Sequence, residues 1–152
     1  MLLDFLQPGL LSGTNGDLDY LSVVEWFGDT TEPLAHVAAL GAFGIHCKFI
    51  TTGNFELVEQ QINKGIPVPV GWLHKGDLRL DGPYGDGHWS VITGFEDENL
   101  FVCDPNGEAD LLTGQYLDTA VEAGDQVRYS RSHFSTRWEV EGTGTGWMML
   151  VI

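Results

Sequence analysis

The strongest chemical signal in the sequence is a histidine and an aspartate that lie at the ends of two neighbouring apolar runs. His88 opens a run that ends at Phe95, and Asp104 follows the next run, which begins at Leu100. The polar residues between the runs indicate a hairpin turn, so both side chains are expected at one end of a sheet. A carboxylate that holds one imidazole nitrogen directs the other toward a nucleophile and stabilises the imidazolium. The pattern therefore predicts a histidine–aspartate pair of the kind that activates a nucleophile.

This pair depends on the residue count of the hairpin loop. Side chains alternate between the two faces of a strand, so His88 shares its face with Ser90. Pairing Phe95 with Asn99 gives an odd loop, which sets Asp104 opposite Ser90 and diagonal to His88. An even loop would put the two side chains on opposite faces. In that case His88 is a strand-end histidine and Asp104 begins an Asp-Pro-Asn-Gly turn.

The nucleophile that such a pair would serve is not evident from the residues. The sequence contains two cysteines, which by default are buried free thiols. Strand alternation turns Cys103 to the face opposite Asp104, and Cys47 lies within a predicted strand without a helix N-terminus to lower the pKa of its thiol. Ser90 is expected near Asp104 but lacks an evident oxyanion hole. None of the three is a convincing nucleophile.

The elements that position these residues fall into two groups along the chain. Apolar periodicity and capping residues predict helices at residues 17–27, 31–44 and 54–65, with Asn54 as the cap of the third. A short strand is expected between the second and third helices, at residues 46–50. Beyond residue 65 only strands are expected, at residues 66–74, 88–95, 100–104, 127–130 and 147–152. Helices followed by strands predict one α+β domain, residues 1–152, with an antiparallel sheet.

Two further residues are expected near the pair. Trp72 could line a groove, and His74 ends the strand of residues 66–74, where it could approach His88. We therefore predict that both contact a substrate. Two histidines and a carboxylate could also bind a metal, but this needs converging geometry. A partial calcium-loop pattern from Asp104 lacks the distal glutamate, so a turn is favoured. Neither a metal nor a cofactor is expected.

Charge and composition exclude several classes of partner. The formal net charge is −15, which repels phosphate backbones and anionic membrane surfaces, so nucleic-acid binding is not expected. The apolar runs are too short to span a bilayer. The first six residues lack the basic region and cleavage site of a signal peptide. These features fit a location in the cytoplasm or in a virion equally well.

Three segments in this order resemble the peptidase C39-like family, a papain-like cysteine peptidase family of bacterial and phage proteins. They are Gly-Ile-Pro-Val at residues 65–68, Gly-His-Trp at 87–89 and Asp-Pro-Asn-Gly-Glu at 104–108. The resemblance covers most of the chain from about Thr51 onward. It implies a papain-like fold with N-terminal helices packed on a C-terminal antiparallel sheet. It also implies that His88 is the general base, that Asp104 orients it, and that the substrate is a peptide or a cell-wall crosslink.

The sequence departs from the family at the nucleophile. The family carries its cysteine at the start of the first helix, shortly after a glutamine, and no such pair is present here. Residues 1–6 resemble the part of that helix downstream of the cysteine. The resemblance therefore implies either a start site further upstream or a form that has lost the nucleophile. The first alternative predicts a peptidase, or a hydrolase of another amide. The second predicts an inactive papain-like module that binds peptides or virion proteins.

Overall fold

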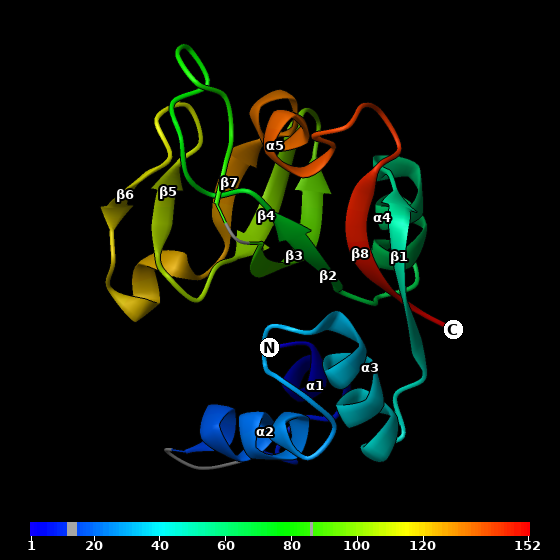
Figure 1. Ribbon diagram of the computed structural model, residues 1–152. Coiled ribbons are helices and arrows are strands. Elements are labelled where there is room, and N and C mark those ends of the chain that lie inside the picture. The colour runs from blue at the N-terminus through cyan, green and yellow to red at the C-terminus, as the bar shows by residue number, and fades with distance from the viewer. Residues whose placement is uncertain (12–14, 86) are drawn as a thin grey trace. The chain divides into compact units, whose positions relative to one another are not determined.

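The chain folds into two compact units, the first mainly helical and the second built on a β-sheet (Figure 1). The computed structural model describes residues 1–11, 15–85 and 87–152. The first unit comprises residues 1–49 and 149–152, and the second comprises residues 50–148. The assignment of residues 1–152 to a single domain stays a prediction.

The described part of the first unit contains three short helices. They are α1 (Leu2–Leu6), α2 (Gly16–Glu25) and α3 (Pro33–Ala42). Val24 of α2 packs against Ala35 and Ala39 of α3, and the hydroxyl of Tyr20 lies 3.0 Å from Nδ1 of His36. The two longer helices confirm those predicted at residues 17–27 and 31–44. Within residues 1–11, 15–85 and 87–152, the structure contains no helix that has both the length and the apolar character to span a bilayer.

A six-stranded sheet with the order β1-β8-β2-β3-β4-β7 forms the centre of the second unit. Its strands are β1 (Cys47–Gly53), β2 (Val68–Trp72), β3 (His88–Glu96), β4 (Asn99–Cys103), β7 (Val127–Ser130) and β8 (Gly146–Val151). The β8–β2, β2–β3, β3–β4 and β4–β7 pairs are antiparallel. The last residues of β2 and β4 therefore lie at the same end of the sheet as the first residues of β3 and β8. The predicted α+β class and antiparallel sheet are confirmed.

β2 contains Pro69 although this strand does not lie at an edge of the sheet. β2 is an interior strand between β8 and β3. Pro69 pairs with Val91 of β3, whereas the pairing with β8 begins one residue later, at Val70. Because proline has no backbone N–H, it is tolerated where a strand makes fewer ladder hydrogen bonds. Here that position is the start of β2, before the register with β8 begins.

Two helices of the second unit pack against its sheet, α4 (Phe55–Ile62) and α5 (Arg131–Trp138). Asn54 caps α4 as predicted, because its side chain accepts a hydrogen bond from the backbone of Leu57. The expectation that only strands follow residue 65 is wrong at α5. Its serine, threonine and histidine content gives a weak helical signal. Packing stabilises α5 instead, since Phe134 is fully buried with its ring 5.3 Å from that of Trp72.

A second, two-stranded sheet lies beside the main one and was not predicted. It consists of β5 (Glu108–Asp110) and β6 (Gln115–Asp118), followed by a short 3₁₀ helix, η1 (Val121–Gly124). The backbone N–H of Ala109 donates to the Tyr129 hydroxyl of β7 at 2.8 Å, which ties this hairpin to the main sheet.

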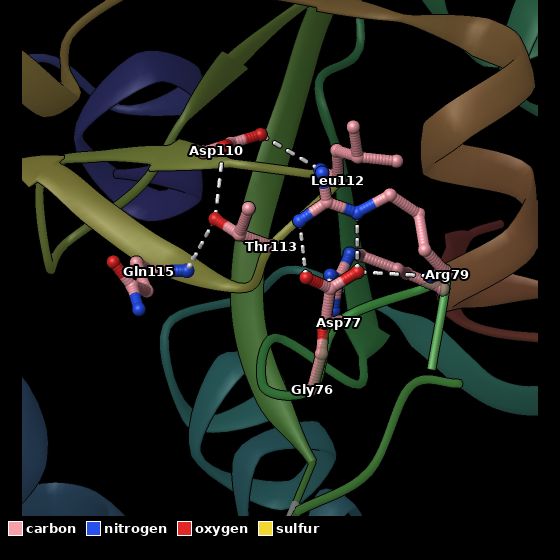
Figure 2. Close-up of polar contacts among 8 residues, drawn as sticks. Gly76, Asp77, Arg79, Asp110, Leu112, Thr113 and Gln115 are labelled. Atoms are coloured by element: carbon pink, nitrogen blue, oxygen red, sulfur yellow. Dashed lines mark hydrogen bonds and ion pairs between the residues drawn. The ribbon is translucent and has the colours of Figure 1, made fainter. Parts of the chain in front are cut away.

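The turn of the β5–β6 hairpin packs against the loop that begins at Gly76 (Figure 2). The N–H of Leu78 donates to the carbonyl of Leu112 at 2.9 Å and so joins the two segments. Each segment is also braced internally. Asp77 accepts hydrogen bonds from Arg79, and Asp110 accepts them from the turn that follows it. The loop that begins at Gly76 is thus attached to the β5–β6 hairpin through Leu78.

Candidate active site

His88 and Asp104, called the dyad from here on, are joined by a buried hydrogen bond. His88 is the first residue of β3, and Asp104 directly follows β4. Nε2 of His88 lies 2.7 Å from Oδ1 of Asp104, and both side chains are almost completely shielded from solvent. Because Nε2 is committed to the carboxylate, Nδ1 is the ring nitrogen that remains for proton exchange with a third group. The structure thus brings together the two residues that the sequence singled out.

A β-bulge sets the dyad on one face of the sheet. The hairpin loop is even, since Glu96 pairs with Asn99, and the predicted odd loop is wrong. The register then shifts between Ile92 and Gly94, which leaves Thr93 as the extra residue of β3. Beyond the bulge Val91 pairs with Cys103, and the next residues of the two strands are Ser90 and Asp104. The bulge therefore restores the alignment that an even loop alone would have lost.

Asp104 is fixed by its own backbone as well as by His88. Its N–H donates to the carbonyl of Gly124 at 2.8 Å, and its Oδ1 also accepts from the N–H of Asn106 at 2.9 Å. Gly124 must lack a side chain, because a Cβ there would lie 1.9 Å from the Asp104 carbonyl oxygen. The second carboxylate oxygen, Oδ2, is buried and has no hydrogen-bond partner among the described residues. The carboxylate is thus held in one orientation.

Trp72 supports the imidazole from within the sheet. Its side chain is buried, its Nε1 donates to Oγ of Ser90 at 3.0 Å, and its ring meets that of His88 edge-on, 5.4 Å between centroids. The Ser90 hydroxyl is likewise buried, which leaves it unsuited to attack a substrate. Trp72 thus lies directly beside the dyad, although the contact with a substrate that we expected of it stays a prediction.

His74 and Tyr116 complete the surroundings of the imidazole. The His74 ring lies 4.8 Å from that of His88, and its pKa is lowered by burial and by the proximity of His88 and Lys75. The hydroxyl of Tyr116, on β6, lies 3.3 Å from Nε2 of His88. Burial and the nearby Asp104 carboxylate raise the pKa of Tyr116 to about 12, so this hydroxyl remains protonated. The sequence predicted the place of His74 but gave no signal for Tyr116.

Arg137 connects the segments that carry His74 and Tyr116. Its guanidinium is fully buried and donates to four backbone carbonyls, those of Leu111, Leu73, Lys75 and Gly76, at 2.5 to 3.1 Å. Burial lowers the pKa of Arg137. This residue of α5 therefore holds the chain on both sides of His74 against the β5–β6 hairpin. Sequence reasoning missed it because α5 itself was not predicted.

Neither cysteine has the environment of an activated thiol. The Cys103 thiol donates to Oδ1 of Asp125 at 3.4 Å, and burial is the main cause that raises its pKa. Cys47 lies at the start of β1, and burial raises the pKa of its thiol as well. A nucleophilic cysteine needs a lowered pKa, so both remain thiols at neutral pH. Across the described part of the chain, no group of three histidine, cysteine or acidic side chains is arranged to bind a metal.

The sequence matches the model of a known family over residues 16–144. The chain belongs to the Peptidase_C39 like family. The match extends upstream of Thr51, where the resemblance of the sequence motifs began, and so includes α2 and α3 of the first unit. Membership in this family confirms the C39-like assignment drawn from the three motifs, which include both residues of the dyad.

Two solved structures resemble the chain, and the first of them supports the same fold. The peptidase domain of Streptococcus ComA, a bi-functional ABC transporter involved in a quorum-sensing pathway, matches with a TM-score of 0.55 and 15% identity. That match covers 88% of this chain and 75% of the other. A C39-like peptidase from Bacillus anthracis matches with a TM-score of 0.49 and 15% identity, over 78% of this chain and 57% of the other. No curated protein matches the sequence. At this identity the ComA domain shows that the C39-like fold is shared.

Proposed function

We propose that this chain carries the histidine–aspartate part of a cysteine peptidase or amidase that hydrolyses peptide bonds. The observation that carries the proposal is the buried 2.7 Å hydrogen bond between Nε2 of His88 and Oδ1 of Asp104. Such a pair fixes the imidazole and stabilises its protonated form, which is what a general base next to a thiol requires. Membership in the Peptidase_C39 like family supports the same reaction class.

In this proposal the proton moves through Nδ1 of His88. Nδ1 takes the proton of a thiol, and the thiolate attacks the carbonyl carbon of the substrate. The protonated ring then donates that proton to the departing amine, which leaves an acyl-thioester. Water, deprotonated by the same nitrogen, hydrolyses the thioester and regenerates the thiol. Asp104 remains ionised throughout and holds the ring in one orientation.

The thiol would come from a residue other than Cys47 and Cys103, because burial raises the pKa of both. The expected substrate is a peptide, and a cell-wall crosslink is one such substrate. A papain-like module that binds peptides or virion proteins without cleaving them is the competing proposal.

The test is peptide hydrolysis by the protein at its natural length, established by intact mass. We expect cleavage that iodoacetamide abolishes and that His88→Ala lowers by about 10²-fold or more, the usual contribution of a general base. His133→Ala is the matched control, since His133 is exposed on α5. Undiminished cleavage by His88→Ala would remove the general base. Peptide binding without any cleavage by the unmodified protein would favour the inactive module.

A further inference from the structure

A cavity of about 390 Å³ opens at the same end of the sheet as the dyad. Gly87, which precedes His88, and Leu73, which precedes His74, both line it. Its other walls come from α5 and β8, including Trp138 and Trp147. Ligand pockets in proteins start at about 300 Å³ and are lined mainly by apolar and aromatic side chains. The cavity has the size and lining of a binding site.

Glycines create this hollow. A Cβ at Gly71 would make ordinary contacts with the ring of Trp89 and with Cβ of Trp147, at 3.4 to 3.5 Å. A Cβ at Gly87 would meet, among the described residues, only the Trp147 ring within 4 Å, at 3.9 Å. Neither residue has a positive φ, so backbone conformation does not require glycine at these positions. The absence of a side chain at Gly87 therefore leaves space next to the Trp147 ring.

The aromatic walls are held in place. Nε1 of Trp138 donates to the carbonyl of Trp147 at 2.8 Å, and Trp138 packs so closely on Gly146 that a Cβ there would lie 2.3 Å from its ring. Trp147 itself is 46% exposed, so part of its ring is accessible. The partly exposed indole of Trp147 lines the cavity, where its ring is suited to stack on another apolar group.

The charges around the cavity further restrict the class of ligand that it can bind. Arg137 lines the cavity, but the N–H groups of its guanidinium already donate hydrogen bonds to four backbone carbonyls. Among the described residues that line the cavity, the remaining charged one is Glu141, which is exposed. An incoming carboxylate would meet a like charge and lack an available cation. The site is therefore unfavourable for the free C-terminus of a peptide.

We propose that this cavity, named here the Trp147 pocket, binds a large apolar or aromatic side chain within a peptide whose backbone passes the dyad. This assignment rests on the proposed function for the identity of the ligand as a peptide. It predicts preference for an internal residue with a bulky side chain, because neutral backbone on both sides avoids repulsion by Glu141.

Binding to the Trp147 pocket is measured without any cleavage, by NMR of the indole N–H signals during titration of the folded chain. The probes are N-acetyl-L-phenylalaninamide and N-acetylglycinamide. We expect the first to shift the Trp138 and Trp147 signals saturably and to bind at least about tenfold more tightly, given the apolar surface it buries. Equal binding of the two probes would overturn the proposal.

The blocking variant is Gly87→Leu, which projects a side chain toward Trp147 without a backbone clash. It should abolish the saturable shifts. Gly41→Leu is the control, because a Cβ at Gly41 of α3 meets open space. Gly71→Ala fills the floor of the pocket should Gly87→Leu fail to fold. Unchanged probe binding in a folded blocking variant would refute the site. Since none of these readouts involves hydrolysis, failure here differs from failure of the peptidase proposal, in which binding persists and cleavage is absent.

Discussion

Asp104 determines the orientation of the imidazole because one of its oxygens accepts two hydrogen bonds. Oδ1 receives the ring N–H of His88 and the backbone N–H of Asn106, whereas the buried Oδ2 has no partner among the described residues. The amide N–H of Asn106 cannot move without moving the loop. The oxygen that faces His88 is therefore fixed as an acceptor by the backbone.

This asymmetry predicts different outcomes for two substitutions of Asp104. In Asp104→Asn the amide oxygen should take the place of Oδ1, since both neighbouring groups are donors, and His88 should keep its proton on Nε2. Asp104→Ala should lose that preference and destabilise the fold by about 1–3 kcal/mol, the cost of unpaired buried groups. Nitrogen-15 NMR of the imidazole measures the tautomer. A mixture of tautomers of the same proportion in both variants would contradict the assigned role of Oδ1.

The lowered pKa of His74 predicts that the stability of the fold depends on pH. Its pKa in the fold is lowered from the ordinary value of 6.5 by burial and by His88 and Lys75, so the unfolded chain binds this proton more readily. The stability due to neutral His74 is therefore complete above about pH 6.5 and is lost as the pH falls below it. Urea unfolding from pH 7.5 to 5 should show a smaller decrease for His74→Asn than for the unmodified protein. His133→Asn, on the exposed surface, should leave the decrease unchanged, and an equal decrease in all three proteins would refute the prediction.

Among the elements, the β3–β4 hairpin shows what the sequence could and could not predict. The apolar runs and their polar turn predicted the two strands and placed His88 and Asp104 at one end of the sheet. The bulge at Thr93 was not predictable, because it has no distinctive residue and depends on pairing with β4. Two errors in the prediction, an odd loop and a regular β3, offset each other, so the dyad was correct for a partly wrong reason.

Helix α5 and the β5–β6 hairpin could not be predicted from local sequence signals. α5 has few strong helix formers, and tertiary contacts of Phe134 stabilise it. β5 and β6 are only 3 and 4 residues long, too short for a clear alternation of apolar and polar residues. Tyr116 and Arg137 lie on these elements. The sequence therefore predicted the residues of the dyad, and it missed two that brace it.

The four hydrogen bonds of the Arg137 guanidinium predict that even a conservative substitution of this residue lowers stability strongly. Lysine concentrates its donors at one point, so Arg137→Lys cannot reach four carbonyls on two separate segments. We expect the free energy of unfolding to fall by about 3 kcal/mol, from at least two buried carbonyls left unpaired. Chemical denaturation measures this loss. Arg128→Lys is the control, since Arg128 pairs with Glu96 on the surface and should tolerate the change. Similar stability of both variants would show that the four bonds contribute little.

For the molecule as a whole, acidic charge is distributed unevenly. The formal net charge is −15, and Lys48 is the first basic residue in the sequence. Helices α1 and α2 of the first unit therefore carry acidic residues without any compensating lysine or arginine. Such a surface repels nucleic acid and favours cationic ligands. The expectation that nucleic acid is not a partner stays a prediction that this charge distribution supports.

The two compact units raise the question of whether they unfold together. Their boundary falls within β1 and within β8, so two hydrogen-bonded strands of the sheet continue from one unit into the other. Local unfolding on one side of the boundary would disrupt strand residues that belong to the other, which favours a single cooperative transition. Four of the five tryptophans, Trp72, Trp89, Trp138 and Trp147, lie in the second unit, so tryptophan fluorescence reports mainly on that unit. Circular dichroism at 222 nm reports on helices of both units, α1, α2 and α3 in the first and α4 and α5 in the second. We expect coincident urea midpoints by tryptophan fluorescence and by circular dichroism at 222 nm. Two separate midpoints would show that residues 1–152 form two domains that unfold independently.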